Sequence, residues 1–125
     1  MKYLSPLLAL FVSIALFSYA KPEAKEPFDL HQILKSNVES ALHERNVEPE
    51  SQRFILSHLS PVYSYVTIKR YQENGVTHLL IDEFNYDEWK NSITGEVGKS
   101  PHGTKSNYSY TKDGWEGTEV VNYGG

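Results

Sequence analysis

The clearest periodic pattern in the chain lies in residues 30–45, where apolar residues recur every three or four positions. These residues are Leu30, Ile33, Leu34, Val38, Ala41 and Leu42. Just ahead of them, Phe28 stands before Asp29, and Gln32 follows three positions later, an arrangement typical of a capped helix start. We therefore expect an amphipathic helix of about residues 30–45 with its apolar stripe buried.

Residues 50–59 fit two patterns equally well. Phe54, Ile55, His58 and Leu59 form a helical face, and Pro49 suits the first turn of a helix. Read with a period of two, the same residues alternate as they would in a strand. Over so short a run, periodicity does not decide between helix and strand.

A β-hairpin is expected in the middle of the chain. Residues 62–73 are rich in Val, Thr, Ile and Tyr, Asn74-Gly75 is a preferred two-residue turn, and residues 76–86 form the return strand. The turn fixes the register, which places Tyr65 opposite Phe84, Ile68 opposite Ile81, and Arg70 opposite Leu79. One face then carries Val62, Val66, Ile68, Leu79 and Ile81, and is the expected seat of the helix. The other carries Tyr63, Tyr65, Tyr71, Leu80, Phe84 and Tyr86, as a second packed surface or a partly exposed one.

A second hairpin follows, with strands at residues 105–112 and 115–123 joined by Asp113-Gly114. Between the hairpins, residues 87–104 contain three glycines and Pro101 and show no pattern. This segment is either a functional loop or a mobile connection. The predicted fold is α+β, with one amphipathic helix packed on an antiparallel sheet of about four strands.

The first twenty residues have the order of a secretory signal: Lys2, a run at residues 7–17 that is apolar except for Ser13, and small residues at positions 18 and 20. The alternative, a membrane anchor, needs about 20 apolar residues, whereas residues 4–20 include Pro6 and three serines. We expect a signal peptide at 1–20, a disordered leader at 21–28 and a single domain at 29–125. The protein would then be secreted, to the extracellular space or to a Gram-negative periplasm, and no longer attached to a membrane.

Composition excludes several classes of function. Removal of Lys2 with the signal leaves 11 basic and 16 acidic residues without a basic cluster, which gives no electrostatic reason to bind nucleic acid or anionic lipid. The chain has no cysteine, so disulfides, thiolate zinc sites and cysteine nucleophiles are ruled out.

No residue pattern argues for an enzyme or a cofactor. The five histidines lack close metal-ligand spacing, although His78 and Asp82 share a strand face that His58 can approach in a folded chain. The segment ending in Gly98-Lys99-Ser100 has Ile93 where a phosphate loop needs glycine. The acidic residues at 82–88 are typical of a solvated strand end.

Over residues 30–86 the chain resembles the cystatins, and most closely the single-domain stefin type, which also lacks cysteines. In this resemblance, the helix from Leu30 corresponds to the family helix and residues 53–60 (RFILSHLS) to the first long strand. Residues 65–71 and 76–81 correspond to the next two strands. The resemblance implies inhibition of papain-type cysteine proteases by loops that wedge into the active-site cleft.

The binding residues implied by this resemblance are Pro61, Val62, Tyr63 and Trp89. The family's wedge loop reads Gln-Val-Val-Ala-Gly, whereas residues 60–64 read Ser-Pro-Val-Tyr-Ser, so only Val62 corresponds. The flexible glycine ahead of the family helix is missing. In place of the Pro-Trp of a second loop, Trp89 follows a glutamate.

The alternative is a secreted interaction module, such as an immunity protein, an effector or a surface-binding domain. It would use the aromatic face of the first hairpin, because exposed aromatic patches mark partner sites. In both cases we expect a monomer with a protein partner.

Overall fold

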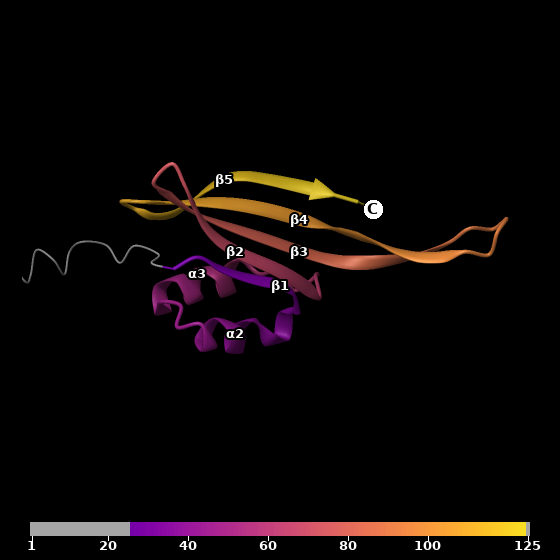
Figure 1. Ribbon diagram of the computed structural model, residues 1–125, viewed down its shortest axis with the longest axis horizontal. Coiled ribbons are helices and arrows are strands. Elements are labelled where there is room, and N and C mark those ends of the chain that lie inside the picture. Colours follow the sequence, from indigo (N-terminus) through magenta and orange to yellow (C-terminus); the bar gives the residue numbers. More distant parts are fainter. Residues whose placement is uncertain (1–25, 125) are drawn as a thin grey trace, which may run out of the picture.

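A computed structural model describes residues 26–124, which form one five-stranded antiparallel sheet with two short helices on one face (Figure 1). The strands lie in sequence order across the sheet: β1 (Phe28–Leu34), β2 (Tyr65–Glu73), β3 (Val76–Lys90), β4 (Val97–Thr111) and β5 (Gly114–Tyr123). Between β1 and β2 run a 3₁₀ turn (Lys35–Asn37), α2 (Val38–Glu44) and α3 (Pro49–His58). The α+β class is as predicted, with five strands instead of four.

The predicted helix at 30–45 is wrong over its first half, because Phe28–Leu34 is an edge strand paired with β2. Leu30 pairs with Ile68 and is buried, but the register then shifts at a bulge before Ile33. The bulge adds a residue to the strand, so two inward-facing side chains stand three positions apart and imitate helical spacing. Phe28 therefore belongs to a strand and not to the leader predicted at 21–28. The first five residues of that leader, like the predicted signal peptide, lie outside the described residues.

The ambiguous residues 50–59 lie mostly in a helix, α3, with Pro49 in its first turn. Both helices pack their apolar residues against the face of the sheet that was predicted to seat a helix. The buried core consists of Leu30, Val38, Leu42, Val47, Ile55, Val66, Ile68, Leu79 and Ile81. Val62, predicted to share that face, precedes β2 and is exposed.

The first hairpin has the predicted register, including Ile68 opposite Ile81. Asn74 (φ 53°) and Gly75 (φ 75°) both take positive φ, as a type I′ turn requires. In the second hairpin the turn residues are Lys112 and Asp113, one position earlier than predicted, since Thr111 pairs with Gly114. Gly114 takes the positive φ after the turn, at 103°.

The patternless segment at 87–104 is mostly strand, which corrects its assignment as a loop. β3 and β4 remain paired beyond the ends of β2 and β5, and residues 85–90 and 97–102 project as a two-stranded arm (Figure 1). Only residues 91–96 form the connecting turn. Among residues 26–124, no helix is both long and apolar enough to span a bilayer.

Candidate functional site

Residues 60–64 connect α3 to β2 and are tied to β3 by the side chain of Asn85. The amide oxygen Oδ1 of Asn85 accepts a hydrogen bond from Ser64 N at 2.8 Å. Its Nδ2 donates to the carbonyl oxygen of Val62 at 3.0 Å. One side chain therefore fixes the backbone on both sides of Tyr63.

The other end of this segment is fixed by Glu83 and Lys35. Ser60 N donates to Glu83 Oε1 at 2.6 Å, and Lys35 Nζ donates to the carbonyl oxygen of Ser60 at 2.6 Å. Lys35 N also donates to the carbonyl oxygen of Ser64 at 2.8 Å. The segment is thus held at both ends, while the Val62 side chain remains 68% exposed.

Glu83 occupies an inward-facing position on β3, in the same alternation as Leu79 and Ile81. Burial raises the pKa of its carboxyl group, although the hydrogen bond from Ser60 and the charge of Lys35 act in the opposite direction. A buried carboxylate is tolerated here because it satisfies a loop N–H that would otherwise lack a partner.

Tyr63 does not join the aromatic face to which it was assigned. Its hydroxyl lies 3.2 Å from Thr104 Oγ1, and its ring meets that of His102 edge to face, with centroids 6.3 Å apart. Thr104 and His102 are the β4 partners of Glu83 and Asn85, so Tyr63 lies on the side of the sheet that carries the helices.

Trp89 lies on the arm and is 45% exposed. It pairs with Gly98, and a Cβ atom at Gly98 would overlap the indole ring. The indole therefore lies directly over the glycine. Gly98 leaves room for it, and the neighbouring strand restricts its orientation.

The structure places Pro61, Val62 and Tyr63 in the segment held by Asn85, at the end of the sheet from which the arm projects, and Trp89 on the arm itself. Asn85 and Trp89 are four residues apart on β3 and share a face, which separates them by about 13 Å. Between them, Asp87 Oδ2 lies 2.7 Å from His102 Nδ1. We call this set the loop–arm surface: Pro61, Val62, Tyr63, Asp87, Trp89 and His102. A hollow of about 460 Å³ opens at the foot of the arm beside Ser64 and Asn85.

Two parts of the proposed alignment with the cystatins are wrong. Residues 30–34, aligned with the start of the family helix, belong to β1. Residues 53–58 form the end of a helix, not a long strand. Residues 60–64 therefore join a helix to a strand and are not a hairpin loop. The turns of the two hairpins, at 74–75 and 112–113, lie at the opposite end of the sheet.

The predicted aromatic face is present on the side of the sheet without helices. The rings of Tyr65, Phe84 and Tyr86 pack against one another with centroids 5.4–5.7 Å apart. His78 stacks on Tyr71 on this face. His58 instead contacts Phe54 and Tyr108 on the helix side. It therefore does not approach the strand face that His78 and Asp82 share, and these three side chains form no metal site. No group of three potential metal ligands occurs within residues 26–124.

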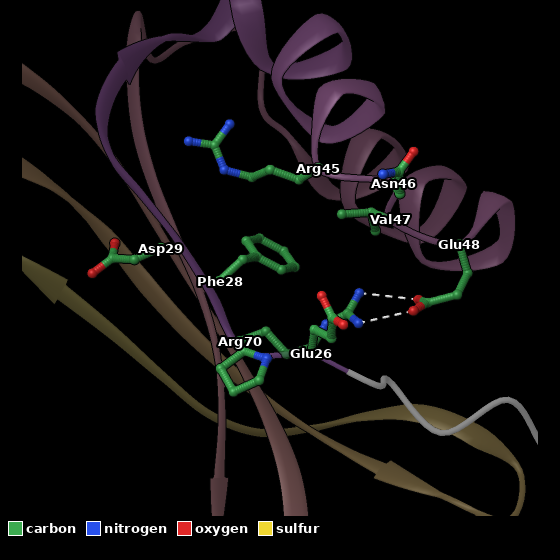
Figure 2. A pocket seen from close by; sticks show the side chains of 9 residues that line it. Glu26, Phe28, Asp29, Arg45, Asn46, Val47, Glu48 and Arg70 are labelled. Atoms are coloured by element: carbon green, nitrogen blue, oxygen red, sulfur yellow. Dashed lines mark hydrogen bonds and ion pairs between the residues drawn. The ribbon is translucent and has the colours of Figure 1, made fainter.

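A second hollow, of about 760 Å³, lies at the hairpin-turn end, where β1 begins (Figure 2). Arg70 and Glu48 form a two-pronged ion pair there, with both N–O distances at 3.0 Å. The Phe28 ring lies against the guanidinium group, 4.9 Å from ring centroid to Cζ. The sequence analysis did not identify this pair. Arg70 follows Val66 and Ile68 at every second position of the strand, and this placement on the apolar face was a usable signal of a buried charge. Because Glu48 neutralises Arg70, the pair is structural and assigns no ligand.

Three comparisons, with protein-family models, with curated proteins and with solved structures, find no match to this chain.

Proposed function

We propose that the protein is exported and that its mature form binds a protein partner through the loop–arm surface. The observation that carries this proposal is the exposed Val62 side chain on a segment whose backbone is fixed by Asn85, Glu83 and Lys35. A soluble domain gains no stability from an apolar side chain held in solvent. A binding surface does gain, because a segment ordered beforehand loses little conformational freedom on association.

Trp89 supplies the second anchor of this surface. Tryptophan is enriched among the few residues that dominate the energy of protein interfaces. Its indole is restricted by Gly98 and still nearly half exposed, so a partner can cover it without first ordering it. Pro61 further limits the freedom of the segment before binding.

Within this proposal, the specific activity to test first is reversible inhibition of papain-type cysteine proteases. Support comes from the sheet packed on helices along one face and from the short, uncharged segment Pro61-Val62-Tyr63, which has the character of a wedge. Such a segment would fill an active-site cleft without offering a correctly oriented scissile bond. Tyr63 is bulkier than the alanine of the family loop and is the expected source of any steric conflict.

The test is titration of papain and a cathepsin with residues 21–125. Val62→Asp and Trp89→Ala should each weaken inhibition by about 2 kcal/mol or more, roughly thirtyfold. The matched control is Val76→Asp, an exposed valine at the opposite end of the sheet, which should leave inhibition unchanged. Absence of inhibition at micromolar protein rules out the protease activity. Equal effects of all three variants rule out the loop–arm surface.

A further variant, Asn85→Ala, isolates the contribution of a fixed backbone. It removes the hydrogen bonds to Val62 O and Ser64 N without altering any residue of the loop–arm surface. Inhibition should weaken, while the near-ultraviolet circular dichroism of the core remains that of the unaltered protein. Unchanged inhibition would mean that preorganisation of the segment does not matter.

The open aromatic face supports a second candidate, an interaction module that uses Tyr65 and Tyr86. The specific observation is that these rings lie on the face without helices and remain partly exposed. Binding of such a partner would be abolished by Tyr86→Ser and unaffected by Val62→Asp. The loop–arm proposal requires the reverse pattern.

For export, we propose cleavage after Ala20, which leaves Lys21 at the amino terminus. Intact-mass measurement and N-terminal sequencing of secreted protein should show loss of residues 1–20. Recovery of a membrane-associated protein that retains residues 7–17 would contradict both the cleavage and the location.

A further inference from the structure

The sheet has four free edges among the described residues, and three of them carry features that discourage pairing with another chain. β1 is short and bulged, with Gln32 at a φ of 44°. The outer edge of the β3 part of the arm carries the adjacent acids Asp87 and Glu88, and that of the β4 part carries Lys99 and Pro101. Bulges, charges and proline are the means by which natural sheets protect their edges.

The fourth edge, β5, has less of this protection in its second half, where Glu119 is the one charged residue among residues 119–123. Residues 119–123 (EVVNY) contain no basic residue and no proline, and the β4–β5 irregularity lies before them. The helix α3 contacts β5 at Trp115, in the first half of the strand. Farther along, Val120 is 64% exposed on the side of the helices, and Val121 is 44% exposed on the other side. A strand with apolar side chains on both faces and unpaired backbone groups along one edge is a template for strand addition.

We propose that a second copy of this chain pairs with this edge, β5 against β5 in antiparallel orientation, about a two-fold axis at Val121. This register places Val121 opposite Val121 of the second copy, and Val120 opposite Asn122. Glu119 lies opposite Tyr123, so no two carboxylates face each other. A two-fold axis at Glu119 would oppose two carboxylates and is unfavourable.

The two-fold arrangement is closed, so it gives a dimer and not a fibre. It also leaves the segment 60–64 free in both copies, because that segment lies beside β2 and β3, and β4 separates them from β5. The expectation of a monomer is thereby replaced by a weak dimer that presents two copies of the loop–arm surface.

Sedimentation of residues 21–125, which include every strand, helix and core residue, tests this pairing. From micromolar to about 0.5 mM protein, where weak homodimers form, the weight-average mass should rise toward twice that of the monomer. Val121→Lys places two like charges at the axis and should abolish the rise. Ile93→Lys, which changes an exposed apolar residue at the tip of the arm, is the matched control and should leave the rise unchanged.

Single-cysteine variants test the register, since the natural chain has no cysteine. Directly opposed antiparallel residues have Cα separations of about 4.5–5.5 Å, within the range that a disulfide spans. Under mild oxidation, Val121→Cys should crosslink into a covalent dimer much faster than Val120→Cys, which faces Asn122. A monomer at all concentrations overturns the inference. The inference is also overturned if Val121→Lys leaves the dimer unchanged, or if Ile93→Lys abolishes the rise in mass as completely as Val121→Lys does. Faster crosslinking of Val120→Cys than of Val121→Cys would overturn it as well.

Discussion

The ion pair between Arg70 and Glu48 has one buried partner and one accessible partner, so its two members should not be equally replaceable. The Arg70 side chain is 3% exposed and that of Glu48 is 23% exposed. Glu48→Gln leaves a buried guanidinium without a counter-charge, and Arg70 Nε already has no hydrogen-bond partner. Breaking a buried pair in this way costs about 3–5 kcal/mol.

Arg70→Met should cost less, about 1–2 kcal/mol. Methionine replaces most of the buried stem, and Glu48, left alone, can turn toward water. The loss is then mainly the contact with the Phe28 ring, about 0.5–1 kcal/mol, together with imperfect packing. Once Arg70 is gone, Glu48→Gln should add almost nothing, so the double variant should resemble Arg70→Met alone.

Urea unfolding of the four proteins at pH 7 measures these differences and gives a coupling free energy, expected to exceed about 2 kcal/mol. Similar denaturant slopes would show that all four proteins unfold from equally compact states. The reasoning is refuted if Glu48→Gln costs less than Arg70→Met, or if the two losses simply add.

The same pair should make stability sensitive to acid. Burial alone would raise the pKa of Glu48, but hydrogen bonds from Arg70 and Ser51 and the charge of Arg70 outweigh it and lower that pKa. A carboxyl group with a lower pKa in the folded state stabilises the protein above its unfolded pKa, near 4.3. This stabilisation is lost as the pH falls through the lower folded pKa. Glu48→Gln should lack that part of the acid dependence.

Three further substitutions have expected outcomes that thermal or urea unfolding can measure. Gly75→Val places a β-branched residue at positive φ beside Asn74 and should cost about 1–3 kcal/mol; an unchanged melting temperature would contradict the type I′ turn. Gly103→Ala places a Cβ atom on the carbonyl oxygen of Glu83 and should cost more than Gly75→Val, because that backbone cannot move aside. Glu83→Gln keeps an acceptor for the loop but removes a carboxyl group whose pKa is raised by burial. Ionisation of Glu83 lowers the free energy of unfolding as the pH rises from about 4.3 through that raised pKa. Compared with the unaltered protein, Glu83→Gln should therefore be more favourable at pH 7 than at pH 4. A variant that compares worse at pH 7 than at pH 4 would contradict this.

The turn and register of the first hairpin were predictable to the residue because the turn and the alternation agree, although β2 begins at Tyr65 and not at residue 62. Asn74-Gly75 fixes the register, and no bulge interrupts β2 or β3 between Tyr65 and Phe84. The first helix was misjudged where a bulge changed the apparent period. Over residues 28–34 the sequence is compatible with both helical and strand spacing, and only the pairing with β2 selects the strand.

The arm was missed for a different reason. Its strands have solvent on both faces, so neither face needs to be apolar and no alternation appears between Asp87 and Pro101. Exposed Val62 and Trp89 were identified from residue type, but Asn85, which fixes the segment, was not. An amide in an otherwise aromatic and charged strand end has no distinctive spacing, and its role depends on a segment more than twenty residues away.

The arm lies outside the hydrophobic core, so the stability of the fold places few constraints on its residues. No member of the hydrophobic core lies at 85–90 or 97–102, so most side chains there can change without removing buried apolar area. Gly98 is an exception, because any larger residue would displace the Trp89 indole. Asn85 is another, because it joins the foot of the arm to the segment at 60–64. Selection for stability therefore leaves the arm nearly unconstrained. Under the proposed function, a joint constraint on Trp89 and Gly98 would come from the partner that we propose Trp89 contacts.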